Sequence, residues 1–144
     1  HRRSSAASDV YKRQVLEKLL RNDNDSNVRA EAANSLASYG VERAWPLLKA
    51  AFLADDAWLV RCSILSALAE QPQINLGWLL DLASVAITDA DGTVRVSGAE
   101  ILGRIVREGR DQPVGEQART LLRPLQQDGD HRVVAAALNG LQAT

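Results

Sequence analysis

Four copies of one short pattern run through this chain, and they constrain its fold more than any other feature. A Val-Arg pair preceded by acids occurs at Val28, Val60 and Val94, and a degenerate fourth copy begins at Val133. Self-similarity at such a regular period is typical of repeat architectures, in which each unit buries its apolar face against its neighbours. The sequence is therefore expected to fold as an array of similar units.

Apolar residues at fixed offsets from each valine predict two helices in every copy. Four and eight residues after the valine, on one helical face, come Ala32 and Leu36, Ile64 and Leu68, Gly98 and Leu102, and Ala137 and Leu141. Twelve and eight residues before it come Leu16 and Leu20, Leu48 and Phe52, Leu82 and Ala86, and Leu121 and Leu125. Each copy is therefore expected to form a helical hairpin.

The predicted fold class is all-α, an α-α superhelix or solenoid of about four helical hairpins. We expect first helices near residues 15–22, 43–54, 75–88 and 115–127, and second helices near 27–39, 58–70, 93–108 and 131–143. Glycines and prolines between these segments separate repeats at about 15–40, 41–72, 73–110 and 111–144.

The turn inside each hairpin is acidic. Asp25, Asp91 and Asp130 lie three residues before their valines, where a carboxylate is expected to cap the second helix. Such a cap contributes about 1 kcal/mol of stability. A further aspartate recurs five residues before each of the four valines, as Asp23, Asp55, Asp89 and Asp128.

A pattern Asp-x-x-Val-Arg-x-x-Ala-x-x-x-Leu emerges from these positions, as DSNVRAEAANSL, DGTVRVSGAEIL and, more loosely, DAWLVRCSILSAL. It resembles HEAT repeats, particularly the short HEAT-like repeats first noted in phycobilisome lyases, and the resemblance extends over residues 15–144. It implies the fold strongly and the function weakly, since many unrelated scaffolds share such repeats.

The resemblance also implies a ladder of charges between neighbouring repeats. Turn acids such as Asp25 and Asp91 would pair with the arginines that follow the first three valines. These are Arg29, Arg61 and Arg95. The fourth copy has Val134 at the arginine position, so its rung is expected to be absent. Arg61→Ala is accordingly expected to destabilise the protein more than Arg104→Ala.

The N-terminal segment, residues 1–14, is expected to be a non-native tail that contributes no stability. Residues 4–14, SSAASDVYKRQ, resemble the translation of a transposase adapter used in preparing DNA sequencing libraries. Without residues 1–14 the chain has 13 basic and 17 acidic residues, a net charge of −4. Since the chain contains no methionine, we expect it to be a fragment or a processed chain.

The residue types present predict neither catalysis nor a cofactor. After residue 14, His131 and Cys62 are the only soft metal ligands, which is too few for a zinc or iron site. His131 is expected to be a solvated turn residue, and Cys62 a small packing residue in a reducing, cytoplasmic compartment. No glycine-rich phosphate loop occurs, and no apolar stretch approaches the roughly 18 residues of a membrane helix.

Polar residues on the second helices form the candidate partner surface. Positions three, six and ten after each valine are expected to line the concave side of a solenoid, and those favoured for partner binding are Glu31, Asn34, Ser66, Glu70, Glu100 and Arg104. Three glutamates against one arginine would repel phosphate, so we expect a protein partner and no nucleic acid. An ordinary solvated helix face is the alternative.

The sequence therefore predicts a non-catalytic scaffold for protein–protein interaction, of unknown partner. A phycobilin lyase subunit or relative, which would hold a phycobiliprotein for chromophore attachment or removal, is the alternative that the resemblance leaves open. Of the three tryptophans, Trp58 is the one expected to be exposed.

Overall fold

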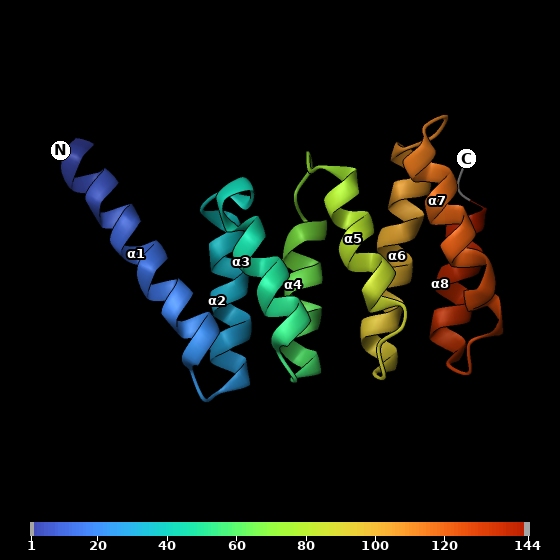
Figure 1. Cartoon of the computed structure of the whole chain (residues 1–144), viewed down its shortest axis with the longest axis horizontal. Helices are drawn as coiled ribbons and strands as arrows, with labels where there is room; N and C mark the ends of the chain where they lie inside the picture. Colours follow the sequence, from blue (N-terminus) through green and yellow to red (C-terminus); the bar gives the residue numbers. More distant parts are fainter. Residues whose placement is uncertain (1, 143–144) are drawn as a thin grey trace. The chain divides into compact units, whose positions relative to one another are not determined.

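The computed structural model describes residues 2–142, with side chains from Ala6 onward, and consists of helices joined by short loops (Figure 1). Its elements are α1 (Arg2–Asn22), α2 (Ser26–Ser38), α3 (Val41–Ala54), α4 (Trp58–Ala69), α5 (Leu76–Ala86), α6 (Gly92–Glu108), α7 (Pro113–Leu122), the 3₁₀ helix η1 (Arg123–Gln127) and α8 (His131–Leu141). No strand occurs in this range. The predicted all-α class of helical hairpins is confirmed.

The helices group into two compact units, which divide between Leu68 and Ala69. In the first unit, α2 packs against α1 and α3. In the second unit, α6 packs against α5, α7 and α8. The second helices α2, α6 and α8 thus lie beside the first helices α1, α5 and α7 of their hairpins, as short connections between antiparallel helices require.

Two element boundaries differ from the prediction. Helix α1 begins at Arg2 instead of near residue 15, because residues 2–14 contain neither proline nor glycine and nothing in them stops the helix. The helix expected over 115–127 ends at Leu122 and continues as η1. Pro124 is the reason, since it has no N–H to donate to the preceding turn.

The predicted apolar positions form the core of each unit. In the first unit, Leu48, Val60, Ile64 and Leu68 are fully buried. In the second unit, Ala86, Val94, Leu102, Val133 and Ala137 are fully buried. Partly exposed exceptions occur in the first and last hairpins, at Leu16, Val28, Leu121 and Leu141.

Small residues let the helices of the second unit approach closely. A Cβ added at Gly98 of α6 would lie 2.8 Å from the Cβ of Ala86 in α5. One added at Gly103 of α6 would lie 3.1 Å from the Cα of Gly140 in α8. The backbones of these helices therefore meet at positions where any side chain would push them apart.

Candidate functional site: the charged ladder and the second-helix faces

The aspartates five residues before each valine, called here the ladder aspartates, all shape their turns in the same way. Each accepts a hydrogen bond on its side-chain Oδ1 from the main-chain N–H two residues later, at 2.8–3.0 Å. They are Asp23, Asp55, Asp89 and Asp128. Such a turn fixes the backbone ahead of the second helix.

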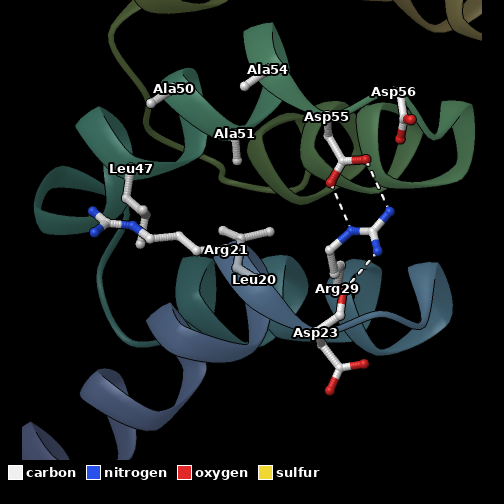
Figure 2. Close-up of a pocket in the computed structure, with 10 residues that line it drawn as sticks. All are labelled: Leu20, Arg21, Asp23, Arg29, Leu47, Ala50, Ala51, Ala54, Asp55 and Asp56. Atoms are coloured by element: carbon white, nitrogen blue, oxygen red, sulfur yellow. Dashed lines mark hydrogen bonds and ion pairs between the residues drawn. The ribbon is translucent and has the colours of Figure 1, made fainter.

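In the first unit, Arg29 of α2 connects its own turn to the turn of the next hairpin. Its Nη1 donates to the carbonyl oxygen of Asp23 at 2.8 Å. Its Nε and Nη2 donate to the two carboxylate oxygens of Asp55 at 2.9 and 3.2 Å, as Figure 2 shows. This bidentate pair is called a rung below, and its planar geometry matches guanidinium to carboxylate.

The second unit repeats this arrangement at Arg95 of α6. Nη1 of Arg95 donates to the carbonyl oxygen of Asp89 at 2.9 Å, and Nε and Nη2 donate to Asp128 at 3.0 and 3.1 Å. In the first unit, Arg61 likewise donates from Nη1 to the carbonyl oxygen of Asp55, at 3.0 Å. Nη1 of all three arginines therefore donates to the carbonyl oxygen of the ladder aspartate in its own turn, and Arg29 and Arg95 make the same rung.

The prediction that Asp25 and Asp91 pair with the ladder arginines is wrong. Asp25 accepts from the N–H of Asn27 at 2.8 Å, and Asp91 from the N–H groups of Thr93 and Val94 at 2.8 and 3.2 Å. Their carboxylates face the helix that they cap. The arginine of one hairpin instead meets the ladder aspartate of the next. The recurrence of aspartate five residues before every valine was the sequence signal for this role.

Asp130 caps α8 in the same way, accepting from the N–H of Arg132 at 2.9 Å. The Arg132 side chain also donates to this carboxylate, which lowers the pKa of Asp130 to about 2 together with the main-chain bond. In the rung, hydrogen bonds from Arg95 and from the N–H of Asp130 hold the pKa of Asp128 below its ordinary value. Its carboxylate raises the pKa of Arg95 in turn.

The second-helix faces hold most of the candidate partner surface. In the first unit, Glu31 and Asn34 of α2 and Ser66 of α4 are exposed. In the second unit, Glu70 and Glu100 are exposed. These five side chains are accessible to a partner.

Arg104 differs from the other candidates, because its guanidinium is held within the second unit. Its Nη1 and Nη2 donate to the carbonyl oxygens of Ala69 and Gln71 at 2.8 and 2.9 Å, and its Nε to Glu108. Its side chain is only 13% exposed. Arg104 therefore satisfies carbonyl groups that lie at and beyond the end of α4, and its place in the partner surface stays a prediction.

Comparison with known families agrees with this geometry. Residues 4–69 match the family model for HEAT repeats. Residues 4–69 are therefore similar to HEAT repeats. The match begins inside the segment expected to be an adapter-derived tail, and it ends with the second hairpin. A comparison with curated proteins finds no match. The HEAT resemblance drawn from the Asp-x-x-Val-Arg pattern is thus confirmed.

A cavity of about 480 Å³ lies beside the first rung, between α1 and α3 of the HEAT hairpins (Figure 2). Leu20, Leu47 and three alanines of α3 form its apolar part. Its charged side chains are Arg21, Arg29 and three aspartates of the two turns. The lining residues include no serine, cysteine or histidine.

The remaining candidates lie as follows. Trp58 is 47% exposed, as expected, whereas Trp45 is buried with the Nζ of Lys49 5.8 Å from its ring centroid. Cys62 is partly buried and His131 is exposed. Among the described residues, no three His, Cys, Asp or Glu side chains are grouped to hold a metal ion, and no helix is long and apolar enough to span a membrane.

Proposed function

We propose that this chain is a non-catalytic scaffold that binds a partner protein on the exposed faces of its second helices. HEAT repeats are generally protein-interaction scaffolds. The observation that carries the proposal is that the charged residues fall into two groups. Arg29, Arg95 and their aspartates pair with one another in the rungs, whereas Glu31 and Glu100 on the second helices remain exposed.

The exposed carboxylates of each unit select a partner by charge. Glu31 in the first unit, and Glu70 and Glu100 in the second, repel phosphate, and Arg104 of the second unit donates to main-chain carbonyl groups. A protein surface with lysines or arginines is the complement that these carboxylates favour. A cytoplasmic location agrees with this proposal, because a reduced thiol suits the partly buried Cys62.

The test compares two charge-reversed variants as baits in affinity capture. One carries Glu31→Lys, Glu70→Lys and Glu100→Lys on the second-helix side. The matched control reverses three exposed glutamates of the first helices instead. These are Glu17, Glu42 and Glu116. Both variants change the net charge equally, so a difference in partner binding between them depends on which helices carry the reversed charges and not on the net charge.

We expect a retained protein to be lost from the first variant and kept by the control. Titration calorimetry with that purified protein then measures the loss, which should reach at least tenfold in Kd. Equal binding by both variants would contradict the proposal. A retained protein that carries bilin absorbance would favour the lyase alternative.

A further inference from the structure

The outer side of the first hairpin presents apolar residues whose equivalents are buried in the second. Leu48 and Val60 of the hairpin α3–α4 are fully buried. Their equivalents Leu16 and Val28 are partly exposed. Together with Leu19 and Ala32 they line a mainly apolar groove of about 260 Å³ between α1 and α2, to which Asn27, Glu31 and Ser35 also contribute.

The ladder aspartate of this hairpin also lacks the contact that defines a rung. Asp55 and Asp128 each receive two hydrogen bonds from an arginine of the neighbouring hairpin. Asp23 makes the same turn, but among the described residues its carboxylate accepts only from the N–H of Asp25, at 2.9 Å. In Figure 2 the carboxylate of Asp55 points toward Arg29, and that of Asp23 points away from it.

The groove and the carboxylate together reproduce one half of an interface that the first unit already contains. In the hairpin α3–α4 the equivalent Leu48 and Val60 are fully buried, α1 and α2 pack against α3, and Arg29 of α2 closes on Asp55. We propose that the outer face of α1–α2 is a docking surface for a helical hairpin of a partner protein. That hairpin carries an arginine in the register of Arg29, which closes on Asp23 as a further rung.

A second copy of this chain does not fit the surface as well. Its last hairpin, α7–α8, has Val134 at the ladder position and so has no arginine there to offer. Arg132, two residues earlier, is paired with Asp130 at 2.8 Å. The chemistry therefore points to a different hairpin, one with apolar side chains for the groove and an arginine for Asp23.

The test supplies such a hairpin in register. A tandem copy of residues 9–40 is inserted directly before Asp9, which places its valine as far before Val28 as Val28 lies before Val60. The copy carries its own equivalent of Arg29. Asp23→Asn is then made in the original segment, both in this extended chain and in the unmodified chain. Asparagine keeps an oxygen for the turn but removes the charge that an arginine would pair with.

We expect Asp23→Asn to leave the melting temperature of the unmodified chain unchanged and to lower that of the extended chain by several degrees. Changing the arginine of the added copy to alanine should abolish this difference. An equal effect of Asp23→Asn in both chains would overturn the proposal. So would an added copy that fails to increase helical ellipticity, since a fitting hairpin folds on this face.

Sedimentation of the unmodified chain tests whether a second copy of the chain occupies the surface instead. We expect a monomer at tens of micromolar. A dimer that Val28→Asp dissociates would show that a second copy occupies the surface, and would overturn the assignment to a different partner.

Discussion

At the scale of single residues, the chemistry of the repeat depends on which way each acid faces. Two aspartates stand two positions apart in the turn, and spacing alone does not say which one meets the arginine. Asp91 turns to the N–H groups of its own helix, whereas Asp128 turns to Arg95 of the preceding hairpin. The sequence shows both acids recurring, but their orientation depends on tertiary packing.

The lowered pKa values of Asp128 and Asp130 predict how stability depends on pH. An unfolded aspartate titrates near pH 3.9. A carboxyl group whose pKa is lower in the folded state stabilises that state above about pH 3.9, and loses this contribution as pH falls toward its folded pKa, about 2 for Asp130. The urea midpoint should therefore fall between pH 4 and pH 2. Asp128→Asn should reduce this dependence of the urea midpoint on pH. An unchanged dependence in the variant would show that Asp128 is not stabilised by the rung.

The hydrogen bonds of Arg104 predict that its loss is costly. Arg104→Ala removes donors from the carbonyl groups of Ala69 and Gln71, and should lower the free energy of unfolding by about 2 kcal/mol. Arg107→Ala, on the exposed side of the same helix, is the control and should change it by less than about 0.5 kcal/mol. Equal effects in urea unfolding would show that Arg104 does not hold these carbonyl groups.

At the scale of elements, the helices were predictable because burial imposes a period on the sequence. Val60, Ile64 and Leu68 lie on one face of α4, and all three are fully buried. Boundaries were less predictable where nothing punctuates the chain, as at the start of α1, or where a proline alters the hydrogen bonding, as at η1. The hydrogen bonds of Arg104 could not be predicted from the sequence either, because their acceptors are distant along the chain and only the fold brings them close.

Close packing between α5 and α6 predicts that Gly98 tolerates no side chain. In Gly98→Ala the new Cβ would lie 2.8 Å from that of Ala86, so the helices must shift, at a cost of about 1–3 kcal/mol. The higher helix propensity of alanine offsets part of this cost. Gly129→Ala is the control, since a Cβ there meets nothing within 4 Å. Thermal unfolding of both variants checks this, and a Gly98→Ala variant as stable as the control would contradict it.

At the scale of the whole molecule, the first residues of α1 are helical but place no side chain in the core. Side chains from Ala6 to Lys12 are exposed. Deleting residues 1–14 should therefore shift the melting temperature by no more than about 2 °C, which is what about 0.5 kcal/mol gives in a chain of this size. A fall of several degrees would show that this segment stabilises the protein, and would argue against its being an adapter-derived tail.

The recurring contact of the molecule is the rung, which occurs as Arg29–Asp55 in the first unit and as Arg95–Asp128 in the second. Its partners are largely shielded from solvent, with side chains 8–20% exposed. An ion pair that is both bidentate and shielded contributes more than a surface pair does. The rungs are therefore expected to couple neighbouring hairpins within each unit.

A double-mutant cycle at each rung tests this account most directly. Each cycle combines arginine to alanine with aspartate to asparagine, which keeps the turn acceptor, and measures the free energy of unfolding in urea. The account predicts a coupling energy of about 1–3 kcal/mol at both Arg29–Asp55 and Arg95–Asp128. Single-mutant effects that add within about 0.3 kcal/mol at both rungs would contradict it, because the arginines and aspartates would then act independently.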